Sequence, residues 1–98
     1  MPETFRDNEP RERFELDVDG HLAFVTYRKS PGEITLVHTE VPPELGGRGV
    51  GSKLGRAALD AVRAQGRKLT VECDFIRGLM RKVPDYNDLL AAEGAAPT

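Results

Sequence analysis

The residues with the clearest chemical potential form a glycine-rich segment, Gly46-Gly47-Arg48-Gly49-Val50-Gly51, followed directly by Ser52 and Lys53. The segment lies between a predicted strand and a predicted helix. Glycines let a backbone turn tightly and approach a ligand closely, and a helix start offers unpaired N–H groups at the positive end of its dipole. The segment therefore predicts an anion site suited to phosphate, with a plain turn-forming loop as the alternative.

Two common phosphate-binding motifs do not fit this segment. A Walker loop places Lys directly after its last Gly and then Ser or Thr, whereas here Ser52 precedes Lys53. A dinucleotide fingerprint needs a third Gly three residues after the second, and counting from Gly49 and Gly51 that place holds Leu54. The phosphate ligand is therefore expected to be of another kind.

Two further residues, His38 and Cys73, have side chains that could take part in a reaction. An ordinary imidazole, with a pKa of about 6.5, mostly accepts a proton at pH 7, so His38 is a candidate general base. Cys73 precedes a predicted short helix, whose N-terminus can favour a reactive thiolate. A hydrogen-bonded strand histidine and a buried inert cysteine are the alternatives. Glu40 and Glu72 are reserve candidates for a base that acts through water.

Hydrophobic periodicity predicts the elements that position these residues. The strands are at Phe14–Val18, His21–Lys29, Glu33–Val41 and Lys68–Cys73. An apolar stripe at spacings of three and four predicts one long helix, from Val50 to a capping glycine at Gly66. A short helix at Phe75–Lys82 and a last turn at Asp85–Leu90 complete the chain.

The order β-β-β-α-β-α predicts an α+β fold with a mixed, mainly antiparallel sheet. Tight turns such as Asp19-Gly20 make the first three strands antiparallel, and a right-handed crossover makes the strand after the long helix parallel to the third. Strict alternation in the third strand predicts one face with Ile34, Leu36, His38 and Glu40, and another with Thr35, Val37, Thr39 and Val41.

The chain has 98 residues, a formal net charge of −2 and one cysteine. This predicts a single domain over residues 1–98, with a loose lead-in at 1–12 and a frayed tail at 92–98. No apolar run approaches the roughly 20 residues of a membrane span, the acidic balance disfavours nucleic-acid binding, and Cys and His are too few for a structural zinc site. We therefore expect a cytoplasmic protein without membrane, nucleic-acid or metal partners, and the oligomeric state stays open.

Four segments occur in a recognisable order and spacing. They are His38-Thr39-Glu40-Val41-Pro42, the glycine segment, Cys73-Asp74-Phe75-Ile76 and Pro84-Asp85-Tyr86. From about Phe14 to Leu90 the chain resembles GNAT-type N-acetyltransferases, and most closely a short subfamily of GNAT-like, N-acetyltransferase domain-containing proteins. The resemblance implies a minimal GNAT-like acyl-CoA N-acyltransferase fold, with acetyl-coenzyme A as cosubstrate and no metal.

The resemblance also implies how the segments bind the coenzyme. The pantetheine arm would lie along the third strand, at Val37, Thr39 and Val41, and the pyrophosphate would lie on Gly46 to Lys53. Three positions depart from the family pattern. They are Gly46 in place of Arg or Gln, Val83 in place of a common His, and Met80 where larger relatives have the Tyr that protonates the leaving thiolate.

The function implied is transfer of an acetyl group from acetyl-coenzyme A to an amine acceptor, small-molecule or protein-borne. Direct attack in a ternary complex, with His38 as base, is favoured over an acetyl-Cys73 intermediate. The alternative is a non-catalytic module that binds or senses coenzyme A or its acyl forms. Phe75 and Tyr86 are expected to be packing anchors. Because the first two predicted strands are joined by a tight hairpin, where typical GNAT domains insert helices, we expect an open acceptor face.

Overall fold

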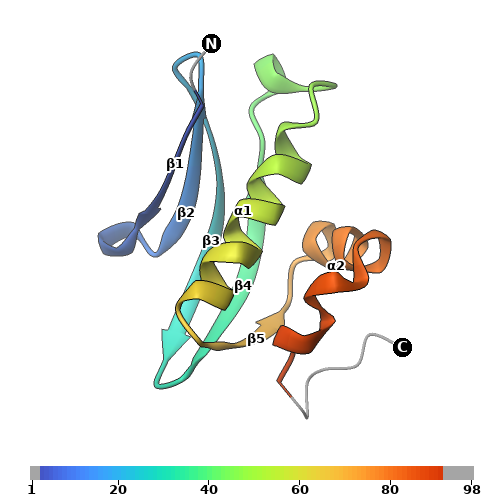
Figure 1. Ribbon diagram of the computed structural model, residues 1–98. Helices are drawn as coiled ribbons and strands as arrows, with labels where there is room; N and C mark the ends of the chain where they lie inside the picture. Colours follow the sequence, from blue (N-terminus) through green and yellow to red (C-terminus); the bar gives the residue numbers. More distant parts are fainter. Residues whose placement is uncertain (1–2, 92–98) are drawn as a thin grey trace.

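A five-stranded mixed sheet forms the centre of the protein (Figure 1). The computed structural model describes residues 3–91, and its strands are β1 (Glu3–Asn8), β2 (Arg13–Val18), β3 (His21–Ser30), β4 (Glu33–Glu40) and β5 (Lys68–Val71). They lie side by side in the order β1-β2-β3-β4-β5. The pairs β1–β2, β2–β3 and β3–β4 are antiparallel, and β5 is parallel to β4. The predicted fold class is confirmed, including the parallel strand after the long helix.

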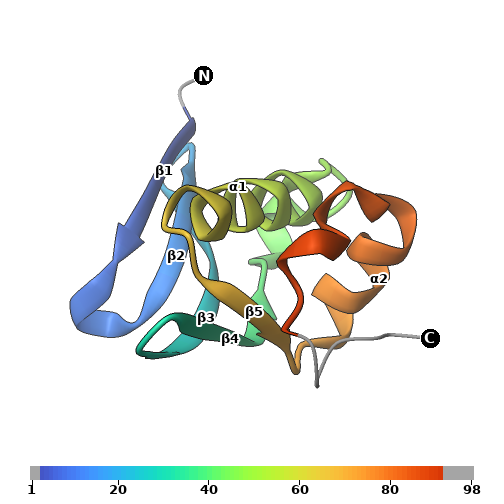
Figure 2. The same ribbon diagram turned by 60° about the horizontal axis from the view of Figure 1, so that its bottom comes forward.

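Two helices cover one face of this sheet. They are α1 (Val50–Ala64) and α2 (Asp74–Lys82), and 3-10 helices lie at Glu9–Arg11, Pro43–Leu45 and Pro84–Leu89. Figures 1 and 2 show α1 running across the sheet, with α2 beside it near β5. The apolar core lies between these layers, and within residues 3–91 no helix covers the opposite face of the sheet (Figure 2).

The N-terminal segment is a strand, not the loose lead-in predicted for residues 1–12. β1 pairs with β2 along its whole length, from Glu3↔Val18 to Asn8↔Arg13. Its residues lack an apolar alternation of their own, and it is held instead by partners on β2. The element order therefore becomes β-β-β-β-α-β-α. The frayed tail predicted at 92–98 lies outside the described residues.

A buried carboxylate shows how β1 is held. Glu15 of β2 is 1% exposed, and it accepts hydrogen bonds from Arg6 (2.7 Å), Arg13 (2.5 Å) and Asn8 (3.0 Å). Burial by itself raises the pKa of Glu15, but these hydrogen bonds outweigh it and hold the pKa below its ordinary value. The strand therefore depends on an ionised Glu15.

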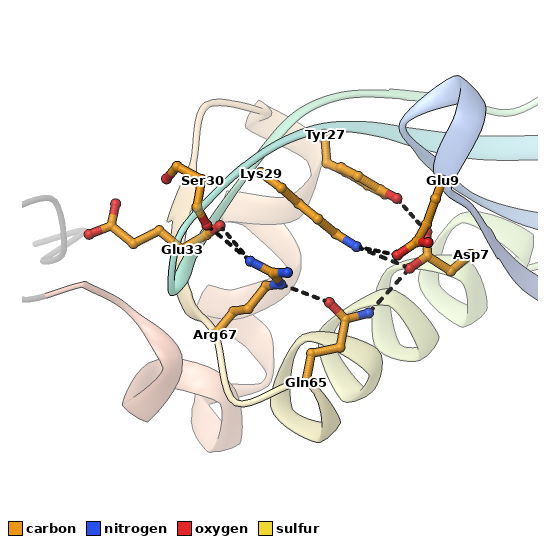
Figure 3. A network of polar contacts seen from close by, with 8 residues as sticks. All are labelled: Asp7, Glu9, Tyr27, Lys29, Ser30, Glu33, Gln65 and Arg67. Atoms are coloured by element: carbon orange, nitrogen blue, oxygen red, sulfur yellow. Dashed lines mark hydrogen bonds and ion pairs between the residues drawn. The ribbon is translucent and has the colours of Figure 1, made fainter.

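A second carboxylate ties β1 to β3 and to the C-terminal end of α1 (Figure 3). Asp7 accepts hydrogen bonds from the Tyr27 hydroxyl, from Lys29 Nζ (3.4 Å) and from Gln65 Nε2 (3.2 Å). Burial, and then the contact with Asp7, raise the pKa of Tyr27 well above its usual range. Beside this group, Arg67 donates to the Ser30 carbonyl oxygen at 3.0 Å. The C-terminal end of α1 is thereby fixed against the sheet.

A β-bulge interrupts the pairing of β3 with β4. Thr26 pairs with His38 and the next residue, Tyr27, pairs with Leu36, so Val37 is one extra residue on β4. An extra residue bends the strand and shifts the phase of its alternation. The strict alternation predicted for this strand therefore fails beyond Leu36.

Candidate functional site

The parallel strands β4 and β5 separate at the point where the candidate residues begin. Their pairing runs from Glu33↔Lys68 to Leu36↔Val71, and Glu72 N then donates to Leu36 O at 2.8 Å. Beyond this bond β4 continues to Glu40, while the segment that follows β5 turns away into α2. The last four residues of β4 therefore have no β5 partner.

The bulge decides which side chains meet at this separation. Thr39 Oγ1 lies 3.1 Å from Cys73 Sγ, and Val41 packs against the apolar core. His38 instead contacts Glu40, with Nε2 2.9 Å from Oε1, and about 60% of each side chain is exposed. The predicted grouping of His38 with Leu36 is therefore wrong: after Val37, the odd-numbered residues face the core and the even-numbered residues face solvent.

Cys73 is the residue that precedes the first turn of α2, and it is 6% exposed. Its Sγ contacts the hydroxyl of Thr39, while His38 has Glu40 as its side-chain partner. A nucleophilic thiol is activated by a base within hydrogen-bond reach or by a helix N-terminus, and within residues 3–91 Cys73 has the second of these and not the first. The structure thus brings the two predicted catalytic residues to the same end of β4 but gives them different partners.

The glycine segment builds an open helix start. Pro43–Leu45 form one 3-10 turn, and Gly47 and Gly49 follow with left-handed φ values of 77° and 73°. A Cβ at either glycine would meet nothing within 4 Å, so conformation rather than space requires glycine there. No side chain in residues 3–91 caps this end of α1.

Three backbone amides of α1 are consequently available to a ligand. The first bond inside the helix is donated by Lys53 N to Gly49 O, at 3.1 Å. The N–H groups of Val50, Gly51 and Ser52 precede it and have no partner within the helix. Together with the positive end of the helix dipole, they form the anion-binding geometry predicted for this segment.

Two glycines of α1 serve helix packing. A Cβ built on Gly51 would lie 2.7 Å from Phe75 Cζ, and one built on Gly55 would lie 2.5 Å from Leu79 Cδ2. The missing side chains let α2 pack closely against α1. Gly51 was predicted as a ligand contact alone. The spacing of four residues between Gly51 and Gly55 was the sequence signal of this second role.

Comparison with known proteins identifies the family. The family model for the GCN5-related N-acetyl-transferases matches residues 13–89. The chain belongs to the GCN5-related N-acetyltransferase family. The solved structures include a similar protein, a GCN5-like N-acetyltransferase candidate from Staphylococcus aureus determined by NMR. It shares 33% sequence identity, and the match has a TM-score of 0.68 over 90% of this chain and 87% of that one. No curated protein matches the chain.

Two cations beside the open helix start of this family member are already in ion pairs. Arg48 Nη2 lies 3.2 Å from Asp19 Oδ2, in the turn between β2 and β3, and Lys53 Nζ lies 2.8 Å from Glu3 Oε2, at the start of β1. All four side chains are at least a quarter exposed. An anionic ligand on this end of α1 would compete with both carboxylates.

Two further findings concern the residues that the structure describes. None of its helices is long and apolar enough to cross a membrane. Within residues 3–91, no group of three or more His, Cys, Asp and Glu side chains is arranged to hold a metal ion.

Proposed function

We propose that the protein binds acetyl-coenzyme A and transfers the acetyl group to an amine acceptor by direct attack. The observation that carries this proposal is the uncapped start of α1 next to the separated strands β4 and β5. Backbone N–H groups at Val50, Gly51 and Ser52 suit a pyrophosphate. The unpaired stretch of β4 suits an extended arm that hydrogen-bonds like an added strand. Family membership supports both assignments.

In the transfer reaction, the amine nitrogen attacks the thioester carbonyl carbon, the C–S bond breaks, and coenzyme A leaves as a thiolate. The nitrogen loses one proton in the process. His38 is proposed as the base that removes it. An ionised Glu40 can only accept a hydrogen bond, so its contact requires Nε2–H and leaves Nδ1 of neutral His38 able to take the proton.

The surroundings of Cys73 support direct attack over an acetyl-cysteine route. The thiol is buried and contacts a hydroxyl, and no imidazole or carboxylate of residues 3–91 lies within hydrogen-bond reach of it. Thr39, which contacts the thiol, is proposed to line the coenzyme arm with Val37 and Val41. The exposed His38 lies on the uncovered side of the sheet, from which a bulky or protein-borne amine could approach.

Binding is tested by the shift in melting temperature that acetyl-coenzyme A produces. We expect stabilisation of the wild type and none for Gly49→Glu, whose carboxylate would occupy the anion site. Gly66→Glu is the matched control, because Gly66 has a similar φ of 69°, an equally open Cβ position and a place at the other end of α1. An equal ligand shift in both variants would refute the assignment.

Turnover is tested by release of free thiol in the presence of a panel of amines. We expect His38→Ala to lower the rate and His21→Ala, the same change at the other histidine, to leave it near wild type. Equal rates in both variants would reassign the base.

A non-catalytic coenzyme A module is the second candidate. Met80, which stands where larger relatives have the thiolate-protonating Tyr, is 2% exposed and part of the apolar core. It supplies no proton to a leaving thiolate. Ligand-induced stabilisation without thiol release, across the whole amine panel, would favour this candidate.

A further inference from the structure

An exposed ion pair lies on the face of the sheet that no helix of residues 3–91 covers. Arg28 Nη2 donates to Glu72 Oε2 at 2.9 Å, and the two side chains are 61% and 50% exposed. Their chain neighbours Tyr27 and Val71 are buried in the core, so strand alternation puts Arg28 and Glu72 on the opposite face. Arg28 belongs to β3 and Glu72 follows β5, so the ion pair reaches across β4.

The strand register places this ion pair beside His38. Arg28 lies on β3 two residues after Thr26, which pairs with His38. Diagonal neighbours of this kind are within reach of a long side chain. On the other side of β4, Glu72 N donates to Leu36 O at 2.8 Å, two residues before His38. The guanidinium that reaches Glu72 therefore crosses β4 next to the imidazole.

The two nitrogens of the His38 ring have different surroundings. Nε2 lies 2.9 Å from Glu40 Oε1, so Nδ1, on the other side of the ring, is turned away from Glu40. Glu40 follows His38 along β4, whereas the ion pair of Arg28 and Glu72 crosses β4 before it. An amine that gives its proton to Nδ1 is therefore on the side of His38 where the guanidinium lies.

The Arg28 guanidinium has unused capacity for a second carboxylate. A guanidinium carries five N–H groups, and within residues 3–91 that of Arg28 makes one hydrogen bond, from Nη2 to Glu72. Its fork geometry matches the two oxygens of a carboxylate. An exposed ion pair is weak, so a ligand carboxylate can share Arg28 with Glu72 or displace it.

We propose that the acceptor carries a carboxylate on the same carbon as its amine or on the next one, and that Arg28 binds this carboxylate. An α-amino acid has this chemistry in its own α-carboxylate, and a polypeptide has it when its N-terminal residue is aspartate. The inference rests on the proposed function. It leaves the bond changes of the transfer as they are and makes Arg28 a specificity-determining residue, with Glu72 as a competitor for its donors.

Rates of thiol release with two matched pairs of acceptors test the proposal. Alanine and alaninamide differ in the α-carboxylate, and peptides that begin with aspartate or asparagine and end in a carboxamide differ in the side-chain carboxylate. Arg28→Gln should raise KM for the carboxylate member of one pair about three- to tenfold, with kcat near wild type. KM for its uncharged partner should not change. Because the amine pKa differs between acceptors but not between protein variants, each pair is compared across variants.

Lys68→Gln is the matched control for the loss of charge. Lys68 is exposed on the same face of the sheet, at the start of β5 and four residues before Glu72, or about 13 Å along the chain. It should leave KM for all four acceptors near wild type. Glu72→Gln should act in the opposite direction to Arg28→Gln, because it releases the guanidinium, and should lower KM for the carboxylate acceptor about two- to fivefold.

The outcomes separate the two sources of the carboxylate and the two levels of the proposal. A change confined to alanine identifies a free amino acid, and a change confined to the aspartate peptide identifies a polypeptide N-terminus. Equal effects of Arg28→Gln on charged and uncharged acceptors, or of Lys68→Gln and Arg28→Gln on all of them, would overturn the inference and leave the proposed function standing. A wild type that releases no thiol with any amine would refute the proposed function and this inference together.

Discussion

Replacing the two carboxylates beside the glycine segment should tighten coenzyme A binding. Asp19 and Glu3 neutralise Arg48 and Lys53, at 3.2 and 2.8 Å, next to the free amides of α1. In Asp19→Asn and Glu3→Gln the cations are released and a negative charge near the phosphates is removed. Asparagine tolerates the left-handed φ of 55° at position 19, so the β2–β3 turn should be preserved.

The size of the effect follows from the exposure of these pairs. Their side chains are 26–56% exposed, and exposed ion pairs contribute about 0.2–1 kcal/mol. At about 1.4 kcal/mol per tenfold, each substitution should tighten binding by about one and a half to fivefold. If the two sites are independent, the factors multiply in the double variant.

Calorimetric titration at low and high salt measures this competition. At about 1 M salt the screening length falls to about 3 Å, so the gain should shrink. Asp88→Asn is the matched control, because Asp88 pairs with Arg63 at the other end of α1. An unchanged or weaker affinity in Asp19→Asn and Glu3→Gln would refute the reasoning. An equal gain in affinity in Asp88→Asn would show that the gain comes from the change in net charge and not from the release of Arg48 and Lys53.

Three further predictions concern the fold. Because the pKa of Glu15 is lowered in the folded state, its contribution to stability is present above the unfolded pKa of about 4.3 and is lost as the pH falls through the folded pKa. The free energy of unfolding of Glu15→Gln should therefore depend less on pH in the acid range than that of the wild type. An identical pH curve for the two proteins would contradict this. Gly55→Leu should lower the free energy of unfolding, measured by urea titration, by about 1–3 kcal/mol, because its side chain would collide with Leu79. A gain in stability would show that α2 can move away from α1 at no cost. Phe5→Ala should remove the stacking on Phe14, at 5.9 Å, and speed amide exchange in β1 while β4 and β5 stay protected; uniform exchange across the sheet would contradict a local role.

The sequence was most informative where one local signal decides the structure. Alternating apolar residues around Phe14 marked β2, Asp19-Gly20 marked the following turn, and the apolar stripe after Val50 marked α1. The open helix start could also be anticipated, since Gly47 and Gly49 are the residue type that left-handed turns require. Each of these features depends on neighbouring residues in the chain.

The sequence was least informative where distant residues decide. β1 is a strand because Glu15 binds Arg6 and Asn8 across the sheet, and nothing within residues 3–8 indicates that partner. The extra residue at Val37 depends on how β3 and β4 pair over their whole length. Alternation gives each side chain a face only when the register is regular, so the surroundings of His38 could not be read from spacing.

The bulge formed by the extra residue Val37 decides which side chains at the end of β4 face Cys73 and which face solvent. Counted from Leu36, the bulge turns Thr39 toward the thiol of Cys73 and His38 toward solvent. A chain lacking Val37 would return to regular alternation with the same faces, because His38 would then follow Leu36 directly and point away from the core, and Thr39 would still point toward the thiol. Deletion of Val37 should thus straighten β4 and leave Cys73 with its hydroxyl neighbour and no base beside it, and an unchanged rate of alkylation at Cys73 would report this.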